Sequence, residues 1–269
     1  RVSSNATSDS VDVGGQSPSR LNDISPEDID RIEVLKGPAA AGLFGTQAAN
    51  GVIQIFTKRG AAGKARWNFF GDVGSITENN NYQPNYGGYF TRNGAATRGC
   101  NLLSVAAGSC TQDSIVTFNP LQDAATTPFR DGRRQQLGVN VSGGSDRSTY
   151  YLSVDRDDEK GIYRTNESDR TNMRANVGAF FNEKLDAQVN VGYLNSRLLL
   201  PENDNNFLGY VSNGLAGFPQ KSRGDDGYDP IGPRQIDQIR NQQDMDRFLG
   251  SVQGNWRPLS WLRFNATTG

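Results

Sequence analysis

Residues 173–193, MRANVGAFFNEKLDAQVNVGY, give the clearest indication of the fold. Apolar side chains occupy every second position from Met173 to Phe181 and again from Leu185 to Tyr193, with Asn, Arg, Gln, Asp and Gly between them. A period of two places the apolar residues on one face of a β-strand. A short polar link separates the two runs, so the stretch predicts two antiparallel strands joined by a tight turn.

The same alternation recurs in five further segments, which brings the predicted strands to seven. These segments are 67–73, 137–142, 150–155, 248–256 and 262–267. Two architectures compete for this pattern. Strands of a soluble sandwich average about 5–6 residues, whereas strands of a membrane barrel run to about 9–11 residues and keep one face wet. The length of the runs and their Asn, Gln, Arg and Asp content favour the barrel.

The links between the predicted strands alternate strictly between long and short. The long links are 74–133, 157–169 and 198–245, and the short ones are 143–148, 182–184 and 257–260. Outer-membrane barrels place short turns on the periplasmic side and long loops outside the cell, and they normally have an even number of strands. We therefore expect further strands after Gly269, and an open sheet edge that keeps this chain from being a stable soluble monomer.

Composition excludes several classes of function. The 269 residues are 35% hydrophobic and 21% charged, and they include no histidine, which rules out a His-ligated zinc site and a Ser-His-Asp triad. A net charge of −1 gives no nucleic-acid footprint. No run approaches the ~18 apolar residues of a membrane-spanning helix. The chain begins with Arg1 and shows no signal peptide, so we expect a piece of a longer protein.

The first sixty residues predict a small mixed unit. Ser25, Pro26 and an acid at position 28 form a helix start of about one turn. Strands are predicted over 31–35 and 52–58, and a short helix or turn over 39–43. Gly37 and Gly42 have the spacing of the first half of a phosphate-binding loop, but Leu43 and Phe44 follow where Lys and Ser or Thr are required. We therefore interpret these glycines as turn residues.

The stretch from Asp28 to Gly60, DIDRIEVLKGPAAAGLFGTQAANGVIQIFTKRG, resembles the end of the plug domain of TonB-dependent outer-membrane transporters. The AANGVI segment and the KRG ending resemble the SusC/RagA branch in particular. The resemblance is strong over residues 21–60, and the strand-and-loop rhythm of 66–269 agrees with it.

The resemblance implies an all-β transmembrane β-barrel preceded by the C-terminal part of a small α+β plug domain. We assign residues 1–62 to the plug and 63–269 to the first strands of a larger barrel. Such proteins import nutrients across the outer membrane, and members of this branch typically take up oligosaccharides or peptides. The implied partners are the TonB complex, through a segment that this sequence lacks, a SusD-like surface lipoprotein and outer-membrane lipid. No cofactor and no nucleic acid are implied.

The resemblance also places plug residues against the barrel wall. Arg31, Glu33 and Lys36 are candidates for charge pairs that hold the plug in place, with solvated strand charges as the alternative. The turn candidates of the plug motif are Gly37, Pro38, Gly45, Asn50 and Gly51.

The first long loop would lie outside the cell. There, an oxidising compartment permits a disulfide between Cys100 and Cys110, with two free thiols as the alternative. Four aromatic residues of this loop are candidates either for ligand contact or for packing within the loop. They are Tyr82, Tyr86, Tyr89 and Phe90.

Several alternative functions were weighed against the sequence. A Ca²⁺ site is conceivable among Asp204, Asp225, Asp226 and Asp229, but the spacing matches no EF-hand and a solvated loop is favoured. Nothing in the sequence places two carboxylates across a cleft as a glycosidase needs, so we do not expect an enzyme. A passive porin or an adhesin needs no plug, so the plug-like residues 21–60 argue against both. A siderophore or cobalamin receptor without a lipoprotein lid is the nearer alternative.

Overall fold

The computed structural model describes residues 23–37, 42, 44, 45, 48, 50–203, 208–217 and 226–269. Only residue 42 of the short helix or turn predicted over 39–43 is described, and Pro38 also lies outside these residues. No helix among the described residues is long and apolar enough to cross a membrane.

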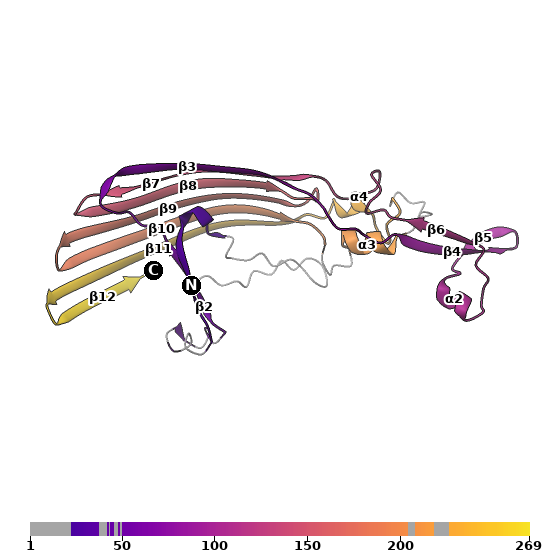
Figure 1. The fold of residues 1–269 in the computed structure, drawn as a ribbon, viewed down its shortest axis with the longest axis horizontal. Helices are drawn as coiled ribbons and strands as arrows, with labels where there is room; N and C mark the ends of the chain where they lie inside the picture. Colours follow the sequence, from indigo (N-terminus) through magenta and orange to yellow (C-terminus); the bar gives the residue numbers. More distant parts are fainter. Residues whose placement is uncertain are drawn as a thin grey trace.

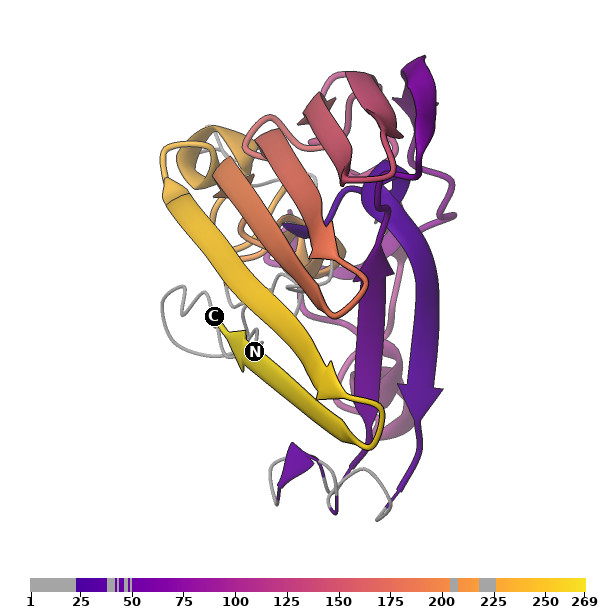
Figure 2. The same cartoon turned by 90° about the vertical axis from the view of Figure 1, so that its left-hand side faces the viewer.

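A seven-stranded antiparallel sheet forms the body of the molecule, in the order β12-β11-β10-β9-β8-β7-β3 (Figure 1). Its strands are β3 (Gly63–Ile76), β7 (Gly132–Gly144), β8 (Ser148–Lys160), β9 (Glu167–Asn182), β10 (Leu185–Leu200), β11 (Asn241–Leu259) and β12 (Leu262–Thr268). The seven predicted strands are confirmed, and all except β12 are 13–19 residues long. Figure 2 shows that the sheet curves into an open wall.

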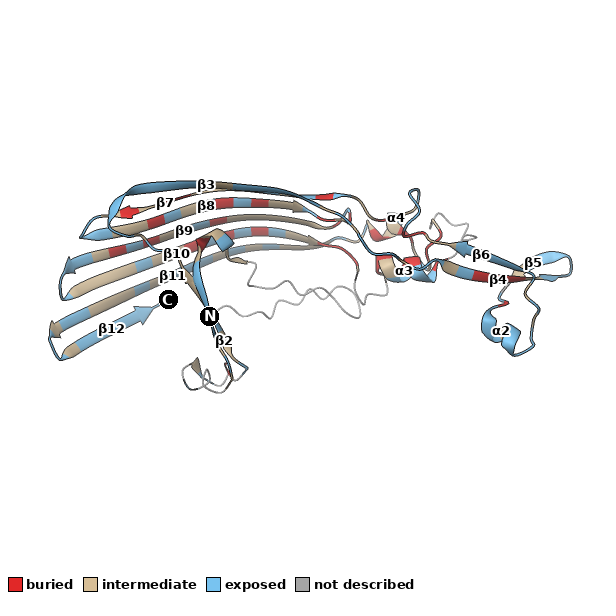
Figure 3. Cartoon of the chain, viewed as in Figure 1, coloured by how far each residue is buried: buried red, intermediate tan, exposed pale blue. Residues whose placement is uncertain are grey.

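Strand register gathers the apolar residues on one face of the wall. One row crosses six strands through Phe69, Val139, Val154, Met173, Tyr193 and Phe248. Phe69 and Phe248 at its ends are 76% and 71% exposed. We call this the outer face. The opposite face, called the inner wall below, carries Asn172, Arg174 and Asn176, of which the two asparagines are buried. Figure 3 shows the buried residues of the wall on the central strands and not on β11 or β12.

The alternation of links is confirmed. Residues 145–147, 183–184 and 260–261 make the short turns, and residues 77–131, 161–166 and 201–240 make the longer connections. The link between β8 and β9 is shorter than the predicted 157–169, because both strands extend beyond the segments in which apolar and polar residues alternate.

The two longest connections contain structure that the sequence pattern did not predict. The first holds a three-stranded sheet of β4 (Asn85–Arg92), β5 (Ala95–Arg98) and β6 (Ser114–Phe118), with helix α2 (Leu102–Ala106). Figure 1 shows this sheet far from the wall, beyond the loop end of the strands. The second connection holds α3 (Tyr210–Ala216) and α4 (Pro233–Ile236).

The N-terminal segment folds as a short turn and a hairpin. The 3-10 helix η2 (Pro26–Asp28) leads into β1 (Ile29–Leu35), which pairs antiparallel with β2 (Val52–Thr57). The predicted one-turn helix and both predicted strands are confirmed. The Lys58 amide donates to the Asp28 carbonyl oxygen at 2.8 Å and closes the open end of the hairpin. This end of the hairpin lies against the inner wall.

Candidate functional site

Asp28 is the central contact between the hairpin and the inner wall. It ends η2 and is only 2% exposed. Its carboxylate accepts hydrogen bonds from the Tyr151 hydroxyl at 2.9 Å and the Ser153 hydroxyl at 2.6 Å, and pairs with Arg174 Nε at 3.1 Å. Three donors from two strands, one of them cationic, satisfy the carboxylate. This explains how a charge is tolerated at such a buried position.

A second contact fixes the end of the hairpin. Asn176 Nδ2 donates to the Lys58 carbonyl oxygen at 2.6 Å and to Thr57 Oγ1 at 3.3 Å. Two residues further on, Gly60 lies directly on the backbone of Tyr150, where an added Cβ would come within 2.2 Å of the Tyr150 carbonyl oxygen. Only glycine therefore permits the chain to cross β8 this closely on its way to β3.

A third contact lies at the start of the described segment. Asp23 accepts a hydrogen bond from Arg247 Nη1 of β11 at 2.6 Å, and both side chains are largely buried, at 13% and 22% exposure. Together with the contacts of Asp28 and Lys58, this pair attaches the segment 23–60 to strands β8, β9 and β11. We call Asp28, Arg174, Tyr151 and Ser153 the latch.

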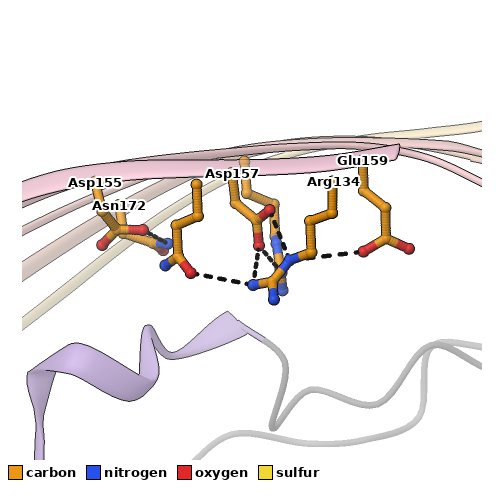
Figure 4. Close-up of polar contacts among 7 residues, drawn as sticks. Arg134, Asp155, Asp157, Glu159 and Asn172 are labelled. Atoms are coloured by element: carbon orange, nitrogen blue, oxygen red, sulfur yellow. Dashed lines mark hydrogen bonds and ion pairs between the residues drawn. The ribbon is translucent and has the colours of Figure 1, made fainter. Parts of the chain in front are cut away.

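A column of charges continues along the inner wall beyond the latch (Figure 4). Asp157 accepts from Arg134 at 3.1 and 2.9 Å and from Arg170 at 2.7 Å, and its side chain is 4% exposed. Beside it, Asn172 Nδ2 donates to Asp155 at 3.2 Å, and Glu159 lies 3.9 Å from Arg134. The three acids stand two residues apart on β8, so they share one face of the strand.

The long connections pack against each other around aromatic rings. Phe129 stacks on Tyr82 at 5.6 Å between ring centroids and contacts Tyr163 at 5.4 Å, and Tyr163 stacks on Tyr210 at 4.7 Å. Burial raises the pKa of Tyr163, and burial together with the hydrogen bond to Asp237 raises the pKa of Tyr210. Both rings belong to the core of the loops, with Ile236.

The charged residues predicted to hold the plug have other contacts among the described residues. Arg31 pairs with Glu33 at 2.8 Å and with Asp30 at 3.3 Å on its own strand, and its guanidinium lies 3.8 Å from the centre of the Phe56 ring. Lys36 is exposed and has no ion pair within the described part of the chain. The structure brings none of the three to strands β3–β12, so their contact with a barrel wall stays a prediction.

The predicted turn residues fall where the hairpin reverses. Gly37, Gly45 and Gly51 have φ angles of 68°, 86° and 111°, in the region that favours glycine. Asn50 is exposed and precedes Gly51 in a turn, where the Gly51 amide donates to the Ala48 carbonyl oxygen at 2.9 Å. Pro38 lies outside the described residues.

The first long connection contains the two cysteines and the four candidate aromatic residues. Cys100 and Cys110 form a disulfide across α2. Tyr89 is 2% exposed within the small sheet, and Tyr82 stacks on Phe129, so both pack the loop against itself. Tyr86 is 40% exposed and its hydroxyl is hydrogen-bonded by Gln112, while Phe90 is half-buried.

The acidic residues considered for calcium do not assemble into a site where they are described. Asp226 pairs with Arg234 at 3.2 Å, while Asp204 and Asp225 lie outside the described residues. No group of three potential ligands that could hold a metal occurs within the described ranges.

Comparison with known proteins decides the family. Residues 3–52 match the family model of the TonB-dependent receptor plug domain. The chain is 27% identical over 181 residues to the TonB-dependent receptor SusC of Bacteroides thetaiotaomicron, a match that covers 66% of this chain and 17% of SusC. The solved RagAB peptide importer in its closed-closed state superposes with a TM-score of 0.64 and 18% identity, covering 94% of this chain and 33% of that one.

The chain is a SusC/RagA-like TonB-dependent receptor. A shorter match, 58% identical over 38 residues, links this SusC/RagA-like chain to the ferrienterobactin receptor of Escherichia coli and covers 14% of this chain and 5% of that receptor. As a member of this family, the receptor belongs in the outer membrane. It spans 17% of SusC and about a third of the RagAB chain that it matches.

Sequence reasoning missed the latch of this SusC/RagA-like receptor. It placed the charges of β1 against the wall and treated Asp28 only as a helix-start residue. One signal was available. Arg174 and Asp155 are charged residues within long strands, on the polar face, and a charge that is buried there needs a partner.

Proposed function

We propose that the whole protein takes up a nutrient across the outer membrane by TonB-dependent transport, with the plug closing the barrel until TonB acts on it. The observation that carries this proposal is the latch. The plug segment is held to the wall by two largely buried ion pairs, Asp28–Arg174 and Asp23–Arg247, and a few hydrogen bonds, contacts that a pulling force breaks locally while the sheet stays paired. We also propose the plug-barrel boundary at residues 62 and 63, supported by the start of β3 at Gly63.

A peptide or an oligosaccharide is the proposed class of nutrient, and the RagAB importer, whose fold this chain resembles, is named for the import of peptides. A SusD-like surface lipoprotein is the proposed partner on the outer side, and the TonB complex is the proposed partner in the periplasm. We propose no catalytic role for the described inner wall, where Asp157 pairs with Arg134 and Arg170, Glu159 lies near the same Arg134, and Asp155 accepts a hydrogen bond from Asn172.

A second candidate is uptake of a ferric siderophore. The match to the ferrienterobactin receptor favours it, but that match covers 14% of this chain against 66% for SusC. Because the match to SusC covers more of this chain, we propose the glycan or peptide importer first and the siderophore receptor second.

The test is uptake by cells that carry or lack the gene for the full-length protein. We expect a fluorescent tryptic digest or a mixture of maltooligosaccharides to enter only cells that have both the receptor and TonB. Uptake independent of TonB would support a passive porin instead, and rescue only of growth under iron limitation would support the siderophore receptor. Affinity purification of the full-length protein from outer membrane should also recover a lipoprotein in near-equal amount.

A further inference from the structure

A cavity of about 660 Å³ lies at the neck of the first long connection, where the chain leaves β3 and returns to β7. Lining residues from 78–82 form one side of it, and lining residues from 121–131 form the other. We call it the neck cavity. It lies at the end of the wall that carries the long loops, which is the outer side of an outer-membrane barrel. It shares no lining residue with the cavities between the plug segment and the inner wall.

Hydrogen bonds join the two sides of the neck cavity. Asn119 Nδ2 donates to the Tyr82 carbonyl oxygen at 2.8 Å and to Gln122 Oε1 at 2.9 Å. Gln122 Nε2 in turn donates to the Asn80 carbonyl oxygen at 3.3 Å. These bonds connect the outgoing and the returning part of the connection beside the cavity. The site is therefore largely formed before a ligand arrives, which lowers the entropic cost of binding.

The ring of Tyr82 lines the cavity and is backed by other rings. It is the last member of a series that runs through Phe129 and Tyr163 to Tyr210. It stacks on Phe129 with 10° between the ring planes, so Phe129 covers one of its two faces. No further ring contacts Tyr82 within the described ranges. The second face of Tyr82 can therefore serve as a flat apolar surface, which the rings behind it hold in place.

Charged groups with unused hydrogen-bonding capacity also line the cavity. Asp131 is exposed and has neither a hydrogen bond nor an ion pair within the described part of the chain. The Asn80 amide donates to Oε1 of Glu78 at 2.6 Å, so Oε2 of Glu78 remains as an acceptor. The guanidinium of Arg130 has only long contacts among the described residues, at 3.5–3.8 Å. The cavity thus offers free acceptors and free donors together.

We infer that the neck cavity is a binding site for a neutral sugar unit, whose ring stacks on Tyr82 and whose hydroxyls bond to the surrounding charged groups. This inference rests on the proposed uptake function and selects an oligosaccharide as the nutrient. A site at this position holds the nutrient at the outer surface, before it reaches the plug.

The lining chemistry favours a sugar over a peptide. Each sugar hydroxyl both donates and accepts, so it can pair with a carboxylate, which only accepts, and with a guanidinium, which only donates. A peptide is usually bound along an unpaired strand edge or through pockets for its side chains. No described strand lines the neck cavity, since β3 ends at Ile76 and β7 begins at Gly132. Its aliphatic lining residue, Leu121, is only 1% exposed, so it offers a peptide little apolar surface.

Binding of oligosaccharides to the purified full-length receptor tests this site. The probes are fluorescent oligosaccharides of α-glucan, β-glucan, mannan and xylan, with a fluorescent tryptic digest of casein as the peptide probe. Tyr82→Leu removes the flat ring, and Asp131→Asn removes an exposed charge without disturbing a packed side chain. Tyr86→Leu and Asp123→Asn are the matched controls, because both residues are exposed in the same connection and neither lines the cavity. The yield of folded receptor in the outer membrane shows whether each variant assembles.

We expect at least one of the oligosaccharides to bind the wild type. Tyr82→Leu should weaken that binding on the order of tenfold and Asp131→Asn about fivefold, because the first loses the stacking surface and the second a charge-assisted hydrogen bond. The two controls should stay within about twofold of the wild type.

The other outcomes separate the site, the sugar class and the proposed function. Wild-type affinity in assembled Tyr82→Leu and Asp131→Asn overturns the site. Failure of every oligosaccharide to bind the wild type, with or without binding of the casein digest, overturns the sugar class. Weakened binding in both variants, together with uptake that does not need TonB, overturns the proposed function and supports the site.

Discussion

The carboxylate of Asp28 lies 3.1 Å from Nε of Arg174, although 146 residues separate the two in the chain. Asp28 belongs to the plug segment and Arg174 to the middle of β9. Their side chains are 3% and 17% exposed, so water screens the pair little. Under the proposed transport function, this pair is a point at which a pulling force on the plug would meet resistance. Loss of either partner would leave the other as an uncompensated buried charge.

Asp28→Asn should loosen the plug without unfolding the sheet. Removing one partner of a buried ion pair costs about 3–5 kcal/mol. We therefore expect trypsin to cleave the plug of the purified full-length receptor at a lower urea concentration than in the wild type. Asp30→Asn is the control, since Asp30 is 56% exposed, and its effect should stay within about 0.5 kcal/mol. Equal urea midpoints for the two variants would contradict the latch.

Gly60→Ala should disturb the crossing of the plug over β8. The new Cβ would lie 2.2 Å from the Tyr150 carbonyl oxygen, and this contact is with backbone, which cannot rotate away. Overpacking of this kind typically costs about 1–3 kcal/mol. The measurement is the yield of heat-modifiable, folded receptor in the outer membrane. Gly74→Ala serves as the control, because its Cβ would meet nothing within 4 Å, and it should assemble normally.

Replacement of Cys100 and Cys110 by serine should loosen the segment around α2, beside the small sheet, and leave the wall unchanged. The disulfide closes a loop with a sequence separation of 10 residues, for which chain entropy predicts a loss of about 2–3 kcal/mol. Hydrogen exchange should speed up over residues 101–112, while exchange in β7–β10 stays unchanged, because the small sheet pairs with none of these strands. A reducing agent should reproduce the effect in the wild type and have none in the double variant. Faster exchange throughout β7–β10 would contradict this prediction.

Alkaline pH should loosen the packing of the long connections. Burial raises the pKa of Tyr163, Tyr210 and Tyr228 above the value of about 10 expected in an unfolded chain. A raised pKa in the folded state stabilises the neutral phenol, so the stabilisation is complete below pH ~10 and is lost as the pH rises above it. Absorbance at 295 nm should show late-ionising tyrosines, and Tyr210→Phe should remove one of them. Ionisation of every tyrosine in one step near pH ~10, with the loops still folded, would contradict this.

The seven long strands, the alternation of short and long links and the hairpin at residues 29–57 could all be predicted from the amino-acid sequence. These features depend on local signals. A period of two specifies a strand face within a few residues, and a turn depends on the residues that form it. The plug motif was readable for the same reason, because its glycines must adopt particular backbone angles wherever they occur.

Which charged residues meet could be seen only in the folded molecule. Asp28 finds Arg174, Tyr151 and Ser153 through the register of β8 with β9 and the position of the hairpin on the wall, neither of which is encoded near residue 28. Arg31, an equally plausible partner by sequence, pairs instead with Glu33, two residues away on its own strand. The small sheet β4–β6 and the neck cavity arise in the same way. They depend on contacts between residues distant in the chain, and such contacts leave no periodic signal in the sequence.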